Sequence, residues 1–127
     1  MKLSQTFYLP VFQIAGLFLF LSSCKNMYPK PMIDIGTDHA EVHFTRGTSN
    51  DQLDFIHNEL EKKEIIIEYS NVKWDGGILS QLEFTIKNKF GNVGTAKTNF
   101  ANLRGRPFGF YIQYDGSVFK VGDLDRK

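Results

Sequence analysis

Three side chains of types that bind metals follow one another at every second position near residue 40. They are His39, Glu41 and His43, and zinc and other transition metals accept imidazole and carboxylate ligands. On a β-strand all three would share one face, because side chains alternate along a strand. Neighbours on that face lie about 7 Å apart, which makes convergence on one ion difficult. Two interpretations therefore stay open: a metal or small-ligand site, and the polar outer face of a strand.

The other residue with distinctive chemistry is Cys24, the only cysteine of the 127-residue chain. It follows an apolar run from Phe7 to Leu21 with the proportions of a secretory signal; a membrane-spanning helix would need roughly 20 apolar residues. With Ser22 and Ser23, the run ends in a sequence that resembles the lipobox of bacterial lipoproteins. The resemblance implies cleavage after Ser23 and a lipid thioether on Cys24. The alternative is an uncleaved membrane anchor with an incidental cysteine.

A lipid on Cys24 would decide where the protein resides. Each buried methylene contributes about 0.8 kcal/mol, so two or three acyl chains, such as palmitate, anchor a protein stably. Lys25, and not an aspartate, follows the cysteine, which in lipoproteins of enteric type favours the outer membrane. We therefore expect a protein of the bacterial cell envelope, lipid-anchored in the outer membrane and facing the periplasm or the surface.

The composition excludes several classes of function. Only Lys2 of the 15 Lys and Arg residues lies in the signal, so the remaining 14 balance the 14 Asp and Glu residues. A nucleic-acid-binding protein would show a basic excess. With Cys24 modified, no thiol remains for a disulfide, a thiolate nucleophile or cysteine-bound zinc. The sequence also lacks the Gly-x-Ser-x-Gly, His-Glu-x-x-His and phosphate-loop patterns, so we expect no enzyme and no cofactor.

An alternating strand over residues 39–46 would carry the three metal-binding side chains, and a helix follows it. Ser49 and Gln52 fit a capping box at the start of this helix, which we expect to end near Lys63. The opposite face of the strand and one stripe of the helix are apolar. These inward positions are Ala40, Val42 and Phe44 on the strand and Leu53, Ile56 and Leu60 on the helix.

The second half of the chain is rich in strand-forming residues. A bulge is expected at Ser70-Asn71, where the apolar alternation changes parity. We predict an α+β fold with one antiparallel sheet of five to six strands packed against a single helix, and with Leu60 and Phe84 buried between the layers. The segments after the helix are 64–74, 78–88, 93–100, 108–114 and 117–121 as strands and 101–107 as a loop.

These elements divide the chain into four parts. Residues 1–23 are the signal peptide, 24–38 a flexible tether, 39–122 the folded domain and 123–127 a frayed tail. The tether would reach roughly 40 Å if fully extended. In the alternative, its apolar residues pack on the domain; they are Met32, Ile33 and Ile35.

Several segments between residues 48 and 119 carry a family resemblance. They are 48–53 with the helix stripe, 69–73, 82–87, Gly91-Asn92 and 107–117. This stretch resembles the small domain at the C-terminal end of membrane metallopeptidases of the BlaR/MecR type, without the peptidase. That family has Gly closing the helix, where this chain has Glu64. The resemblance implies a fold and an accessory role outside the cytoplasm, and it carries no catalytic residue onto this chain.

Three weaker candidates lie outside these patterns. Phe55 stands about 200° from Leu53 on a helical wheel, on the polar back of the helix. Three interpretations of this position are open. The ring is exposed without a role, the tether covers it, or it is an anchor for a protein partner. His57 is expected to border the core. The remaining candidate is a loop that is either solvated or a small anion site, formed by Arg104, Arg106 and Lys97.

We therefore predict a lipid-anchored, non-catalytic interaction or accessory module of the cell envelope. It would contact the membrane through Cys24, an envelope protein is the kind of partner expected, and nucleic acid is not. Exposed strand edges suit recognition by β-augmentation. The alternative is a periplasmic protein that binds a small ligand or a metal through His39, Glu41 and His43.

Overall fold

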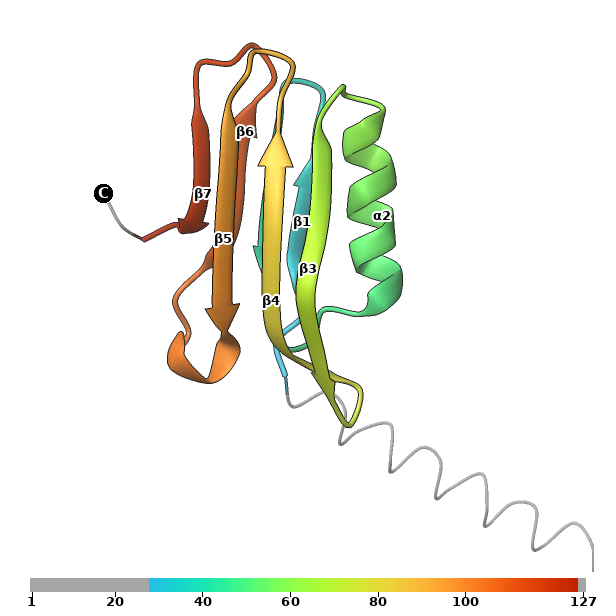
Figure 1. The fold of residues 1–127 in the computed structure, drawn as a ribbon, viewed down its shortest axis with the longest axis vertical. Coiled ribbons are helices and arrows are strands. Elements are labelled where there is room, and N and C mark those ends of the chain that lie inside the picture. The colour runs from blue at the N-terminus through green and yellow to red at the C-terminus, as the bar shows by residue number, and fades with distance from the viewer. Residues whose placement is uncertain (1–27, 126–127) are drawn as a thin grey trace, which may run out of the picture.

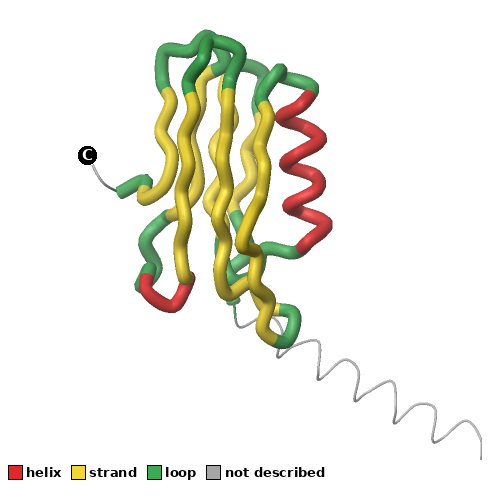
Figure 2. The backbone as a smooth tube through the Cα atoms, in the orientation of Figure 1, coloured by secondary structure: helices red, strands yellow, loops and turns green. Residues whose placement is uncertain are grey.

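The computed structural model describes residues 28–125 and arranges them as two antiparallel sheets that face each other (Figure 1, Figure 2). Cys24 and the signal segment lie outside the described residues. One sheet has the strand order β1-β2-β6-β7 and the other β3-β4-β5. Their strands are β1 (Met32–Ile35), β2 (His39–Phe44), β3 (Ile66–Asp75), β4 (Ile78–Lys87), β5 (Val93–Asn99), β6 (Phe108–Gln113) and β7 (Phe119–Asp123). The helices are α2 (Asn50–Glu61) and the short 3₁₀ helix η1 (Phe100–Asn102).

The core lies between the two sheets and is built largely from phenylalanine. Phe84 on β4 is fully buried, and its ring centroid lies 5.3 Å from that of Phe44, 5.7 Å from Phe108 and 6.0 Å from Phe110. The last three rings all belong to the four-stranded sheet, so each sheet covers the apolar face of the other.

The number of sheets corrects the sequence prediction. Antiparallel strands and a single α-helix are found within residues 28–125, but the expected single sheet of five to six strands is wrong. A helix is about 10–12 Å wide and strands are spaced about 4.8 Å apart, so one helix covers only two or three strands. The remaining apolar surface is buried because the chain crosses through η1 to the opposite layer, where β6 pairs with β2.

The two open sides of the sandwich are closed differently. On one side α2 packs against β3 and, less extensively, β1 (Figure 1), and its apolar stripe is buried as predicted. On the other side β5 lies against β7. A Cβ atom on Gly94 would stand 2.7 Å from Cγ2 of Val121, so the absence of a side chain permits this close approach. The buried stripe of α2 consists of Leu53, Ile56 and Leu60.

Both ends of α2 are specified by local hydrogen bonds. Gln52 N–H donates to the Ser49 hydroxyl over 3.1 Å and Ser49 N–H donates to the Gln52 side chain over 2.8 Å, which confirms the capping box. At the other end, Ile65 N–H donates to the Leu60 carbonyl over 3.0 Å. Glu64 precedes it in the left-handed conformation, with φ of 63°. The last helical residue is Glu61, two before the predicted end.

The predicted inward faces of the strands agree with the observed burial. Phe84 and Leu60 are both fully buried, as expected. The bulge in β3 is also confirmed: the pairing with β4 shifts between Ser70 and Lys73, and Asn71 adopts φ of 48°. The extra residue at that point lets Val72 follow Tyr69 on the core side of β3, whereas Trp74 stays 40% exposed.

The boundaries of the predicted tether and tail are corrected. Met32–Ile35 form β1, antiparallel to β2, and Ile33 and Ile35 pack against the core. Their alternation with polar Asp34 gives this short segment the pattern of a half-buried edge strand. At the C-terminal end, the Leu124 N–H donates to the Pro107 carbonyl over 3.1 Å, so the ordered structure continues past residue 122.

Candidate functional site

The outer face of β2 presents His39, Glu41 and His43, as predicted from their alternation. None of the hydrogen bonds found within residues 28–125 joins His39 to Glu41 or His43. Its Nδ1 lies 2.7 Å from Asp38 Oδ1 and its Nε2 lies 3.1 Å from Asp34 Oδ2, on β1. The hydrogen bond with Asp38, followed by that with Asp34, raises the pKa of the His39 imidazole above its ordinary value. The same bond with His39 lowers the pKa of the Asp38 carboxyl.

His43 belongs to a separate pair. Its Nε2 lies 2.8 Å from Oε2 of Glu41, and both side chains are about one-third exposed. The strand therefore divides the predicted metal ligands into two groups that each satisfy themselves by hydrogen bonds. No set of three or more His, Cys, Asp or Glu side chains with metal-binding geometry occurs in the described part of the chain. This arrangement favours a polar outer face over a metal site.

A second candidate is an open pocket of about 530 Å³ at the end of the sandwich where β2 ends and η1 begins, which we call the end pocket. Its volume lies within the roughly 300–1,000 Å³ range of small-molecule sites. Phe44, Phe100 and Leu103 supply an apolar floor, and each is at least nine-tenths buried. The walls come from three separate parts of the chain: residues 29–32, residues 43–46 and the loop over residues 103–107.

The wall formed by residues 29–32 is held in place by the turn that follows β2. The Thr45 hydroxyl donates to the Pro29 carbonyl over 2.7 Å, and the Arg46 guanidinium lies 5.9 Å from the centre of the Tyr28 ring. The turn itself is fixed by buried Thr48, whose hydroxyl accepts the Thr45 N–H over 2.9 Å. These contacts within the chain fix the position of this wall of the pocket.

The charged side chains that line the end pocket are positive. Lys30, Arg46, Arg104 and Arg106 all line it, and none of its lining residues in the described structure is acidic. Arg106 is occupied: its Nη1 lies 3.1 Å from Oδ2 of Asp123 and its Nε donates to the Leu103 carbonyl. The other three cations take part in none of the ion pairs found within residues 28–125.

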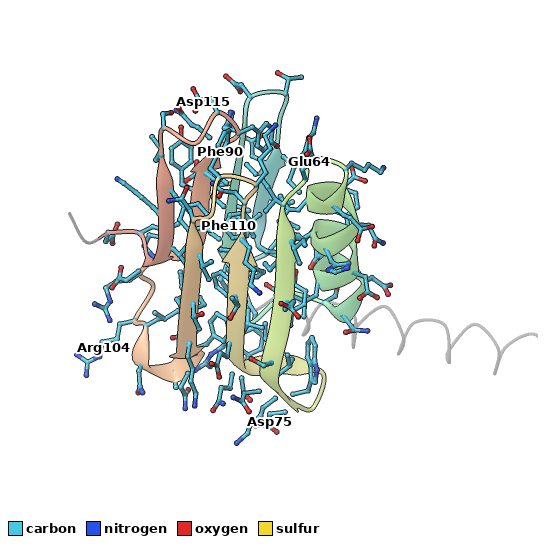
Figure 3. The ribbon with its side chains drawn as sticks, turned by 45° about the horizontal axis from the view of Figure 1, so that its top comes forward. Glu64, Asp75, Phe90, Arg104, Phe110 and Asp115 are labelled. Atoms are coloured by element: carbon cyan, nitrogen blue, oxygen red, sulfur yellow. The ribbon has the colours of Figure 1, made fainter. Side chains whose placement is uncertain are left out.

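This geometry modifies the predicted anion site. Arg104 and Arg106 do lie together, but the third predicted member, Lys97, is exposed on β5 and does not line the pocket. The Arg104 side chain extends away from the sheets (Figure 3). Lys30 and Arg46 take the place of Lys97. The sequence does not indicate this pair, because Lys30 lies in the predicted tether and only the folded chain brings it beside Arg46.

The structure also places the two remaining candidates, His57 and Phe55. His57 borders the core as predicted, with Nδ1 2.9 Å from the Ile67 carbonyl. Phe55 is 51% exposed on the back of α2. Ile33 and Ile35 pack on the core from β1, so the structure does not favour covering of Phe55 by the tether. Two interpretations of Phe55 therefore remain: an exposed ring without a binding role, and an anchor for a protein partner.

Comparison with known proteins gives no relative from which a function could be transferred: no family model, curated protein or solved structure matches the chain. Between Tyr28 and Asp125, none of the helices has the length and apolar character needed to cross a bilayer.

Proposed function

We propose that this protein is a lipid-anchored, non-catalytic binding module of the bacterial cell envelope, in which the end pocket is the binding site. The observation that carries the proposal is the position of the pocket on the chain. Pro29 forms part of its wall, and Cys24 lies only five residues earlier. Five residues span at most roughly 17 Å. A lipid on Cys24 would therefore hold the pocket close to the membrane surface, and not about 40 Å from it as a longer tether would allow.

The chemistry of the pocket supports binding without catalysis. Its lining combines apolar side chains with cations, which bind and orient a ligand. Histidine is the commonest general acid or base, and the one histidine of the lining, His43, has its Nε2 hydrogen-bonded to Glu41. The resemblance of residues 48–119 to the accessory domain of BlaR/MecR-type peptidases supports the same non-catalytic role. Lys25 after the cysteine supports the outer membrane as its location.

The back of α2 is a second surface on which an envelope protein could bind. Phe55 is exposed there, and single aromatic anchors contribute strongly to small interfaces. Phe55→Ser should leave the thermal unfolding midpoint unchanged and abolish capture of such a partner. Unchanged capture would show that the ring is inert.

The anchor is tested by the mass of the protein extracted from membranes. Full-length wild type should lose residues 1–23 and gain the mass of two or three acyl chains, and it should fractionate with membranes. Cys24→Ala should be soluble and carry no acyl mass, because the sulfur that accepts the lipid is gone. Ser22→Ala is the matched control, since it changes a neighbouring small residue and keeps the cysteine. A wild type without acyl mass, together with a Cys24→Ala chain that stays in the membrane, would refute the proposal.

A further inference from the structure

We infer that the end pocket binds an amphiphile with one negatively charged head, either a carboxylate or a phosphate ester, and an apolar chain. The inference rests on the proposed function, because it names the class of ligand for the same site. It is carried by two independent features of the pocket, its floor and its charge.

The floor is suited to an apolar chain. Phe44, Phe100 and Leu103 present carbon atoms to the pocket, and Met32 and Pro107 add further apolar surface to its lining. Each methylene group buried there would raise the affinity about fourfold, so burial of only two would raise it more than tenfold. An ion without an apolar chain, such as inorganic phosphate, would leave this surface in contact with water.

The rim is suited to an anionic head. Lys30 and Arg46 line the pocket from two segments that the Thr45–Pro29 hydrogen bond ties together. Neither is paired with a carboxylate in the described structure, while Arg104 adds a third positive charge at the same end. The chain after residue 23 has balanced charge overall, so this local excess is not a consequence of a basic composition. Guanidinium and ammonium groups donate short, strong hydrogen bonds to carboxylates and phosphates.

Such an amphiphile has two sources in the cell envelope. One is the anionic phospholipid of the membrane to which the protein is anchored, and the other is a free fatty acid or similar monomer in solution. Both present the same chemistry to Lys30 and Arg46, so the experiment has to separate them by the lipid that surrounds the protein.

The test uses the full-length lipid-anchored protein in nanodiscs of neutral phosphatidylcholine, with empty nanodiscs as the blank. Octyl phosphate and octanoate serve as soluble probes, and isothermal titration calorimetry measures their binding. Octanol, which lacks the charge, and inorganic phosphate, which lacks the chain, are the matched ligands. We expect saturable binding of at least one charged amphiphile, about tenfold or more tighter than either octanol or phosphate.

Variants then locate the site on the protein. Lys30→Gln with Arg46→Gln should weaken binding of the charged probe about tenfold or more and leave octanol unaffected, because two charge-assisted hydrogen bonds are lost. Lys120→Gln removes an exposed positive charge from the outer face of β7 and should change the affinity less than about twofold. Thermal unfolding of each variant in the same nanodiscs confirms that the fold is retained.

Three results would overturn the inference: no saturable binding of either charged probe, equal affinity for octanol, or equal loss of affinity in Lys120→Gln. Anionic phospholipid in the nanodiscs distinguishes the sources. Competition with the probe identifies a membrane lipid as the ligand, and lack of competition identifies a freely diffusing amphiphile. Failure of binding in a chain that carries acyl mass would refute the inference alone. Binding by a chain without acyl mass would refute the anchor alone.

Discussion

Glu64→Gly should make the domain more stable, although it removes a side chain and introduces the most flexible residue. Glu64 follows the end of α2 (Figure 3) in the left-handed conformation, with φ of 63°, and its N–H and that of Ile65 make the hydrogen bonds that close the helix. The Glu64 N–H donates to the Glu61 carbonyl over 3.1 Å, and the Ile65 N–H to the Leu60 carbonyl over 3.0 Å. This is the closure in which glycine is normally found, because its lack of a Cβ atom removes the steric cost.

The magnitude follows from three contributions. Relief of the left-handed strain contributes about 1–2 kcal/mol, and the greater freedom of glycine in the unfolded chain costs about 0.4–1 kcal/mol. The ion pair with Lys89 is long, at 3.6 Å, and the Glu64 side chain is 70% exposed, so its loss matters little. Taken from the middle of both ranges, the net gain is about 0.8 kcal/mol. For a domain of this size it would raise the unfolding midpoint by about 3–6 °C.

The assay is thermal and urea unfolding of residues 24–127 with Cys24→Ala, followed by circular dichroism. Glu64→Ala is the matched control: it removes the same charge and the same ion pair but keeps the Cβ atom, so its midpoint should barely change. Glu64→Asn should lie between the two, because asparagine tolerates the left-handed region better than most residues. An equal rise for alanine and glycine would refute strain as the cause, as would no rise for glycine.

Three further predictions concern the core, the first strand and pH. Leu60→Ala and Phe84→Ala should each lower the free energy of unfolding by about 2–5 kcal/mol in urea titrations, and a loss below about 1 kcal/mol would contradict their burial between layers. A chain that begins at residue 39 should be about 2–4 kcal/mol less stable than one that begins at residue 28, because it lacks the half-buried isoleucines of β1. Equal unfolding midpoints of the two chains would refute the packing of Ile33 and Ile35 on the core. In the folded state, hydrogen bonds with Asp38 and Asp34 raise the pKa of His39. The protonated His39 therefore stabilises the fold fully below its ordinary pKa of about 6.5, and this stabilisation is lost as the pH rises through the higher folded pKa. Unfolding measured from pH 5.5 to 8 should therefore depend less on pH in His39→Gln than in wild type, and parallel curves would contradict the assignment.

The local elements could be read from the sequence because short-range patterns specify them. Ser49 and Gln52 are three residues apart, so their capping box depends on nothing outside one turn of helix. The inward faces of β2, β4 and β6 follow from a period of two, and the bulge at Asn71 follows from a break in that period. The outer face of β2 was also correctly predicted, but the Asp34 partner of His39 was not, because Asp34 lies on β1 and reaches His39 only through the pairing of β1 with β2.

Only the tertiary structure decided the number of sheets and the location of the pocket. Residues 108–113 form the same alternating strand whether they pair with β5 or with β2, so the pattern contains no information about the partner. The choice follows from the need to cover two apolar faces at once, and Phe84 is buried against three rings that no local window contains. The end pocket has the same origin: Lys30, Arg46 and Arg104 are far apart in the chain, and the packing of β2, η1 and the first residues of the domain brings their charges together.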